Sequence, residues 1–171
     1  MLGYGQKCIM WLTLKRVPGW TSNLRLATRI QSERAKMQVK CVINDISQLS
    51  SVELTTRLKA SIKLDGADRD LKVGALYEVQ AIENINGYLW YYIQTVEKNS
   101  YPFPYPAEFF VLVDASLPRK WVINFTEKNG SVALKRLAIP QWADSDVFYE
   151  QLVDGEQDVQ RLYNASLTNS A

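Results

Sequence analysis

Histidine is absent from this 171-residue chain. Without an imidazole, the chain cannot form a Ser-His-Asp triad or a metal site that uses histidine. Cysteine is nearly absent: Cys8 and Cys41 stand 33 positions apart without CxxC spacing, which excludes a cysteine zinc site and a dense disulfide scaffold. We therefore expect a cytoplasmic protein with no metal and no cofactor, in which both cysteines act as small apolar residues.

Acidic residues are scarce at the start of the chain. Up to Lys36, seven lysines and arginines face the single acid Glu33, which gives a net charge of +6. From Met37 onward, 13 basic and 17 acidic residues give a net charge of −4. An acidic domain repels nucleic acids and anionic membranes and attracts basic proteins. The charge split therefore predicts a protein partner and argues against nucleic-acid and membrane binding.

Long hydrophobic runs are also missing from residues 1–36. The run Ile9–Leu14 is too short for a secretory signal or a membrane span, and two basic residues follow it. An organellar transit peptide and an extension produced by a start codon assigned too early remain. We favour the extension, because the composition changes at Met37 and a strand pattern begins at the next residue. The sequence thus predicts a basic extension over 1–36, a single domain over 37–163 and a frayed tail over 164–171.

Local patterns after Met37 pass from strand to helix. The segment Gln38–Ile43 alternates like a half-buried strand. Ser50 and Glu53 form a capping box that predicts the start of a helix, and Asp65-Gly66 predicts its end. The apolar residues of this helix recur at every fourth position: Leu54, Leu58 and Ile62. Such a stripe must cover another element, which we expect to be a sheet.

The most regular pattern is a series of short strands separated by turn residues. The strands expected are Leu71–Ile82, Tyr88–Val96, Phe109–Val113, Lys120–Phe125 and Ser131–Leu134. A turn at 84–87 joins the first two as a hairpin, and a turn at 129–130 joins the last two. Further along, an apolar periodicity from Val147 to Tyr163, interrupted at Gly155, predicts helices. This spacing of short strands favours an antiparallel arrangement.

Parts of these strands resemble known domains. The pattern Leu71-x-x-Gly74-x-x-Tyr77-x-Val79, which returns through a glycine turn to Trp90-Tyr91-Tyr92-Ile93, resembles the central hairpin of an SH3-like barrel. A fuller pattern adds Tyr101-Pro102, Phe109-Phe110-x-x-Val113-Asp114, Trp121, Pro140-x-Trp142 and Phe148-Tyr149-Glu150-x-Leu152-Val153-Asp154-Gly155-Glu156. It is similar to a small uncharacterised bacterial domain family, some of whose members resemble immunity proteins encoded beside polymorphic toxins. The resemblance implies a bacterial protein that binds and inhibits a toxin.

The patterns together define the expected fold class. We predict an α+β domain with a small, bent antiparallel sheet or an SH3-like barrel and with two or three packed helices.

Two groups of carboxylates are candidate partner-binding residues. They are the acidic turn with Asp65, Asp68 and Asp70, and the helical group Glu150, Asp154, Glu156 and Asp158. The turn lacks the glycine position and the twelfth-position glutamate of a calcium-binding EF-hand loop. The helical carboxylates lie side by side on one face, whereas glycoside hydrolysis needs two carboxylates on opposite sides of a cleft. We interpret both groups as solvated surfaces that can contact a basic protein.

Aromatic residues form a third candidate surface. In the strand that carries Trp90 and Tyr92, alternation places large apolar side chains on both faces. Either both faces are covered, by the sheet interior and by a helix, or one face is a recognition groove like that of an SH3 domain. The segment Tyr101–Pro106 must be extended, and we expect it to pack on its own sheet, with Tyr105 as a further candidate for the groove. The acidic balance argues against single-stranded RNA on these aromatics.

These surfaces predict a non-enzymatic protein-binding module. In the leading hypothesis, the protein is an immunity-type inhibitor that masks the basic site of a toxin with its acidic loop and helix face. In the alternative, it is an SH3-like interaction or scaffold domain that uses the aromatic groove. An enzyme working through Asp, Glu, Tyr or Lys chemistry has no motif in this sequence to support it.

Overall fold

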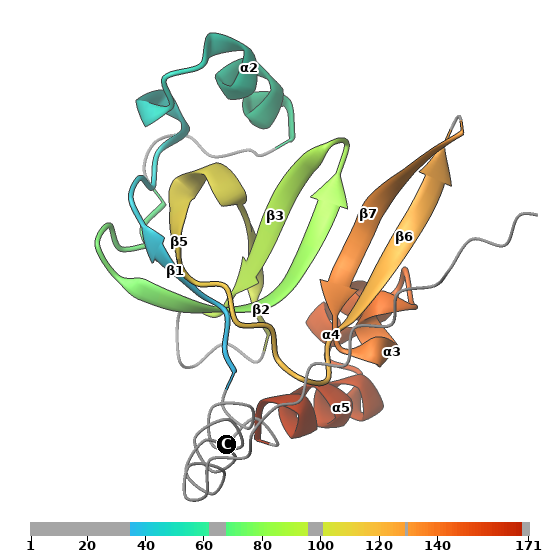
Figure 1. The fold of residues 1–171 in the computed structure, drawn as a ribbon. Helices are drawn as coiled ribbons and strands as arrows, with labels where there is room; N and C mark the ends of the chain where they lie inside the picture. Colours follow the sequence, from blue (N-terminus) through green and yellow to red (C-terminus); the bar gives the residue numbers. More distant parts are fainter. Residues whose placement is uncertain (1–34, 62–67, 96–100, 129, 169–171) are drawn as a thin grey trace, which may run out of the picture.

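The computed structural model describes residues 35–61, 68–95, 101–128 and 130–168 (Figure 1). The strands of this part of the chain are β1 (Gln38–Cys41), β2 (Leu76–Ile85), β3 (Tyr88–Ile93), β4 (Phe103–Pro106), β5 (Phe110–Asp114), β6 (Val122–Lys128) and β7 (Ser131–Ala138). Its helices are α2 (Val52–Ser61), α3 (Pro140–Ala143), α4 (Phe148–Val153) and α5 (Gln157–Thr168), with short 3-10 helices η1 (Ile46–Gln48) and η2 (Ala107–Phe109). The fold is α+β, as expected from the sequence.

The seven strands form one antiparallel sheet that bends at β2. One edge of β2 pairs with β3, and its other edge is shared between two strands. β1 pairs with the first part of β2, at Leu76–Glu78, and β7 pairs with the later part, at Ile82 and Glu83. Beyond β2 the sheet therefore divides into a β1–β5 branch and a β7–β6 branch (Figure 1). The sheet is not closed, so the predicted bent sheet is the form observed, and the barrel is not.

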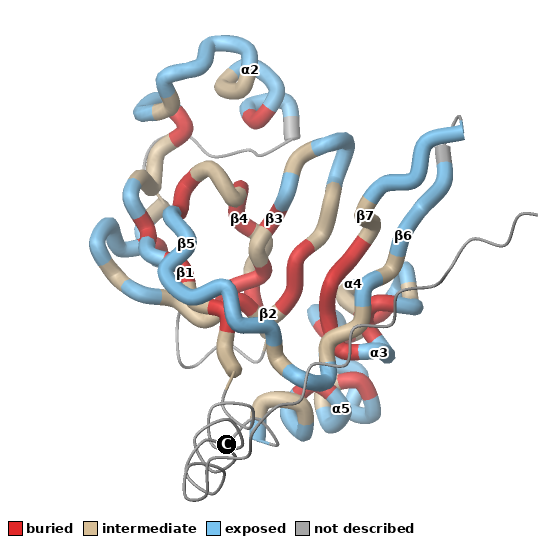
Figure 2. Tube along the Cα trace, viewed as in Figure 1, coloured by how far each residue is buried: buried red, intermediate tan, exposed pale blue. Residues whose placement is uncertain are grey.

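Two hydrophobic clusters cover the sheet, and they appear as the buried segments in Figure 2. The first lies among β1, β2, β3 and β5 and includes Leu58, through which α2 reaches the core. The second lies between the sheet and α3–α5 and is built around Trp142. Both faces of β3 are therefore covered, one of them by helices, as in the first of the two interpretations of this strand.

The hairpin of β2 and β3 follows the sequence prediction closely. Asn86 and Gly87 form its turn with φ angles of 55° and 89°. Such left-handed conformations are typical of the two-residue turns that match the twist of a hairpin, and they favour Asn-Gly. Asn84 fixes the turn further, because its Oδ1 accepts a hydrogen bond of 2.9 Å from the Gly87 amide.

The proline-rich segment also packs on its own sheet as expected. Phe103–Pro106 forms β4, which pairs with β3, and Pro102 and Pro106 are buried. β4 is an edge strand, the position in a sheet where proline is tolerated because one row of amides is not needed for pairing.

Several boundaries differ from the sequence predictions. The α2 cap is Ser51, whose Oγ accepts from the Leu54 amide at 3.3 Å, and the predicted capping box at Ser50 and Glu53 is one residue early. β2 begins at Leu76 and not at the predicted Leu71, because Gly74, with φ of 87°, lies in a turn before the strand. β7 continues to Ala138, and the structure contains four α-helices among the described residues instead of two or three.

The two predicted ends of the domain have different outcomes. α5 continues helically to Thr168, past the predicted start of a tail at 164. At the other end, residues 1–34 lie outside the described residues, so the basic extension and its boundary at Met37 stay predictions.

Candidate functional site: carboxylates on the C-terminal helices

The C-terminal helices are held together by an aromatic stack. The Trp142 ring stacks on Phe148 and Tyr149, with centroids 5.6 and 5.7 Å away. Tyr92 of β3 meets the same indole edge-on at 4.9 Å, and Tyr163 of α5 meets it at 6.3 Å. Offset and edge-on contacts of this kind add to the energy of simple area burial. The stack therefore joins α3, α4 and α5 to the sheet through one buried indole.

A buried arginine fixes the chain between α3 and α4. Arg136 of β7 donates through Nη1 to the carbonyl oxygens of Trp142, at 2.9 Å, and Ser145, at 2.8 Å. Its other terminal nitrogen pairs with the Glu83 carboxylate on β2. From β6, the Asn124 amide donates to the Ala143 carbonyl at 2.9 Å. These contacts hold the segment where the acidic stretch begins.

Carboxylates are concentrated on this helical scaffold. Residues 144–160 contain six acidic residues and no lysine or arginine. Asp146 pairs with Lys135 at 2.6 Å, and this contact holds the pKa of the Asp146 carboxyl below its usual range. Asp158 pairs with Arg161 one turn further along α5.

Of the four that remain, Asp144 accepts a hydrogen bond of 3.3 Å from the Asn124 amide. The other three are exposed, and we call Glu150, Asp154 and Glu156 the acidic surface. No ion pair to a described residue neutralises them. Glu150 and Asp154 are four positions apart at α4, where residues share a helix face. Gly155, with φ of 80°, allows the tight turn that places Glu156 directly after them. The arrangement concentrates negative charge on a rigid support and can attract a cationic group.

The predicted acidic turn is a separate feature. The Asp68 carboxylate accepts from the amides of Asp70, at 2.8 Å, and Leu71, at 3.2 Å, so it stabilises its own loop. Asn44 fixes this loop beside β1 by donating to the carbonyls of Asp68 and Leu71. Asp65 lies outside the described residues. The structure therefore does not bring Asp68 and Asp70 together with the helical carboxylates, which lie beyond β7 (Figure 1).

The three aromatic candidates are interior residues. Trp90, Tyr92 and Tyr105 are only 6%, 3% and 5% exposed. The Tyr92 hydroxyl donates to Glu83 at 2.6 Å, and the Tyr105 ring packs near Phe110. Burial raises the pKa of Tyr105 to about 12, as expected for a phenol removed from water. In this conformation the three residues form core, and they do not line an exposed groove.

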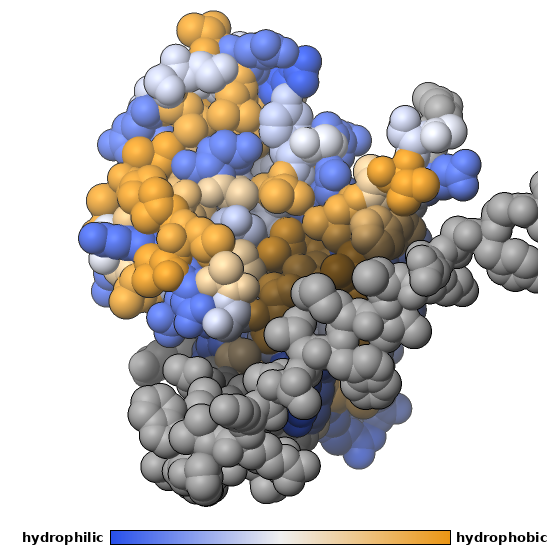
Figure 3. Space-filling model, in the orientation of Figure 1, coloured by the Kyte–Doolittle hydropathy of each residue, from blue (hydrophilic) through white to orange (hydrophobic). Residues whose placement is uncertain are grey.

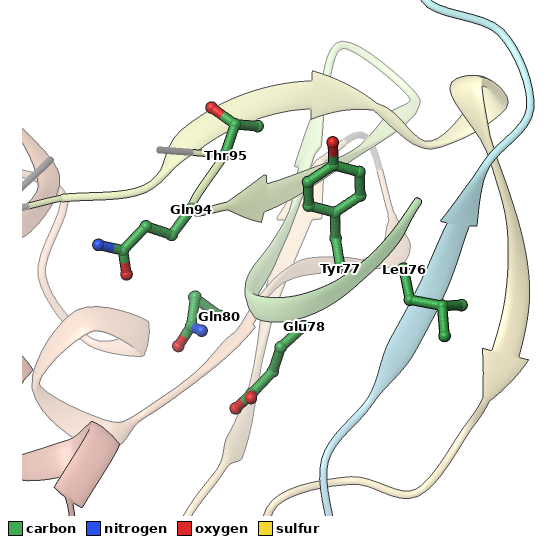
Figure 4. A pocket seen from close by; sticks show the side chains of 6 residues that line it. All are labelled: Leu76, Tyr77, Glu78, Gln80, Gln94 and Thr95. Carbon is green, nitrogen blue, oxygen red and sulfur yellow. The ribbon is translucent and has the colours of Figure 1, made fainter. Parts of the chain in front are cut away.

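The structure also contains an open groove of about 350 Å³ along β2 that the sequence did not predict (Figure 4). It is lined by Leu76, Tyr77, Glu78, Gln80, Gln94 and Thr95. The Glu78 carboxylate pairs with Lys36 at 2.7 Å, and the Tyr77 hydroxyl accepts from the Lys72 amide. The charged and phenolic groups of this groove are therefore used in local contacts.

Arg136, Asp144 and Asp146 were missed as site residues in the sequence. Arg136 could have been found by continuing the alternation of β7, because it shares a strand face with Leu134. The two aspartates could have been found from the long absence of basic residues after position 143.

The described residues contain no group of three or more Cys, Asp or Glu side chains placed to hold a metal ion. No helix in the same ranges has the length and apolar character needed to cross a membrane.

Comparison with known proteins identifies no relative of this chain. No protein-family model, curated protein or solved structure matches the chain.

Proposed function

We propose that this chain is a non-enzymatic, cytoplasmic protein-binding module that receives a cationic protein on its acidic surface. The observation that carries the proposal is the set of three exposed carboxylates, Glu150, Asp154 and Glu156, which have no opposite charge among the described residues. A partner that supplies lysine or arginine side chains would complete these pairs.

The support beneath the acidic surface favours binding. Because Trp142 and Arg136 fix the helices, little conformational entropy remains to be lost when a partner arrives. Exposed charges of this kind mainly accelerate association and select the sign of the partner's charge. An inhibitor that covers the basic site of a toxin needs both properties, and this is the partner class implied by the resemblance to immunity proteins.

The test measures association with a defined cationic probe, a lysine-rich peptide, at low and high salt. A triple variant, Glu150→Gln, Asp154→Asn and Glu156→Gln, removes the acidic surface. The matched control removes three carboxylates elsewhere: Glu53→Gln, Asp114→Asn and Glu127→Gln. We expect association to slow with salt in the wild type and in the control, and to be slow at both salt concentrations in the triple variant.

A second arm of the experiment uses proteins of the native host. Basic proteins retained by the wild type and by the control, and lost by the triple variant, would be the partner candidates. Equal binding by the triple variant and the control, or binding that does not respond to salt, would contradict the proposal.

The aromatic-groove alternative receives less support from the geometry. A scaffold domain that recognised ligands through Trp90, Tyr92 and Tyr105 would need their rings at the surface, and all three are buried.

A further inference from the structure

β5 is an edge strand with one unused side. Its inner side pairs with β1, where Lys40 lies opposite Val111 and Cys41 opposite Phe110. Among the described residues, no strand pairs with its outer side. Figure 4 shows β5 as the strand beyond β1. Its outward amide and carbonyl groups are therefore available to a further strand.

The same strand exposes an unusual amount of apolar side chain. Val111, Leu112 and Val113 are 47%, 52% and 52% exposed. Val42, which follows β1, is 40% exposed and lies beside the start of β5, where its amide donates to the Phe109 carbonyl. The exposed Lys40 of β1 lies opposite both Val111 and Leu76, so it separates β5 from the exposed apolar residues of β2. We call Val42, Val111, Leu112 and Val113 the β5 patch, and Figure 3 shows hydrophobic atoms gathered over β1 and β5.

Edge strands of monomeric proteins normally carry features that prevent further pairing, such as an inward-pointing charge, a proline or a covering loop. Within β5, residues 110–113 carry no charge and no proline, and the one charge of the strand, Asp114, stands at its last residue. Val111 and Val113 lie on one face of β5 and Leu112 on the other, and all three side chains are exposed, so both faces of the strand are open as well as its edge. Such a strand is a site for strand addition.

We propose that β5 pairs with β5 of a second copy of this chain, antiparallel and with Leu112 on the two-fold axis. In this register Val111 meets Val113 of the other copy, and Asp114 meets Phe110, so no like charges are opposed. A parallel register would place the two Asp114 carboxylates opposite each other, which is unfavourable. The edge therefore complements itself, as an isologous dimer interface requires.

Pairing along β5 removes the apolar side chains of the β5 patch from water and gives the outward backbone groups of both copies hydrogen-bond partners. The acidic surface lies on α4 and the turn that follows it, away from β5 (Figure 1), so the dimer keeps two such surfaces free.

The first test measures the molar mass of the full chain by light scattering and sedimentation over a range of concentrations. We expect a monomer–dimer equilibrium. Leu112→Lys should raise the dimer dissociation constant by roughly tenfold or more, because two ammonium groups would be buried near the axis. The matched control is Ile123→Lys on β6, an edge strand whose Ile123 is 53% exposed. It should leave the dissociation constant unchanged.

The second test fixes the register by cross-linking and does not depend on a lysine variant that folds. Under mild oxidation, Leu112→Cys should form a disulfide between two copies, because residues on the axis face each other. Val111→Cys alone should not, whereas a mixture of Val111→Cys and Val113→Cys should. Wild type controls for Cys8 and Cys41, and circular dichroism confirms folding of each variant.

Three results would overturn the proposal. They are a monomer at all concentrations, a dimer lost in Ile123→Lys and kept in a folded Leu112→Lys, and cross-linking of Val111→Cys with itself in place of Leu112→Cys.

Discussion

Glu83 on β2 lies directly opposite Arg136 on β7, and their side chains form an ion pair within the sheet, from which Arg136 also reaches the chain between α3 and α4. The Arg136 side chain is 6% exposed and that of Glu83 is 16% exposed. The Tyr92 hydroxyl donates to the same carboxylate. β2 and β7 are therefore joined by an ion pair that is largely shielded from solvent.

Breaking this pair on one side should be costly. We expect Arg136→Met to lower the free energy of unfolding by about 3–5 kcal/mol, because it leaves the Glu83 carboxylate buried without its counter-charge. Urea unfolding at neutral pH measures the change. The double variant Glu83→Gln with Arg136→Met should recover part of the loss, since it leaves no unpaired buried charge. Lys135→Met, which breaks an exposed pair on the same strand, should change stability little. A similar loss in both single variants would show that the buried pair has no special role.

Two buried tyrosines should respond differently to loss of the hydroxyl. Tyr92 donates to Glu83, whereas the Tyr163 hydroxyl is buried without a hydrogen-bond partner among the described residues. Tyr92→Phe should therefore destabilise the protein by about 1.5–3 kcal/mol, the range for hydrogen bonds to a charged group. Tyr163→Phe should be neutral or stabilising, because it removes an unsatisfied polar atom. Thermal unfolding of the two variants side by side tests the difference, and equal losses would contradict it.

Stability should fall at alkaline pH. Burial raises the pKa of Tyr105 to about 12 and also raises the pKa values of Tyr92, Tyr149 and Tyr163. The unfolded chain ionises these phenols near pH 10, so it loses protons before the folded chain does. Their contribution to stability is therefore complete below about pH 10 and is lost as the pH rises toward about 12.

Tyrosinate absorbance and circular dichroism, recorded together against pH, test this expectation. The buried phenols should ionise in the same transition that removes the secondary structure, and Tyr163→Phe should make the decline less steep. Ionisation of all tyrosines near pH 10 in a still-folded protein would contradict the prediction.

The attachment of α2 to the core should depend mainly on its one fully buried side chain, beside which the half-buried Leu54 packs against the same cluster. Leu58 is 1% exposed and belongs to the first hydrophobic cluster, whereas Val52 at the start of the same helix is 81% exposed. Leu58→Ala should lower the free energy of unfolding by about 2–5 kcal/mol through the cavity it leaves. Val52→Ala is the matched control and should have little effect, because its methyl groups are already in water. Denaturant unfolding compares them, and a small effect of Leu58→Ala would place α2 outside the cooperative unit.

Local chemistry explains which parts of the fold were predictable. The β2–β3 hairpin was predictable because Asn86-Gly87 specifies a two-residue turn whatever surrounds it. The cap of α2 was placed one residue early because Ser50 and Ser51 are adjacent serines, and only the three-dimensional path of the chain selects Ser51. The pairing of β7 with β2 was not predictable, because it depends on contacts between residues far apart in the sequence.

The candidate site was predictable in part for similar reasons. Glu150 and Asp154 were found because helical spacing alone places them on one face. Asp68, in the separate acidic turn, was predicted to bind the same partner, but its carboxylate accepts hydrogen bonds from the amides that follow it, local contacts that composition does not show. Trp90, Tyr92 and Tyr105 were ambiguous because an aromatic strand has the same sequence whether a helix or a ligand covers it.

The shared edge of β2 has a consequence for how the protein is made. β2 is complete at Ile85, whereas β7, which occupies the later part of its edge, begins at Ser131. Until that strand leaves the ribosome, the Glu83 side of β2 has no neighbour and its carboxylate no counter-charge. Pairing Ile82 with Leu137 closes a loop of 55 residues, and such distant contacts slow folding. We expect the nascent chain to acquire its native sheet only after β7 has emerged, with its first hairpin exposed to chaperones until then.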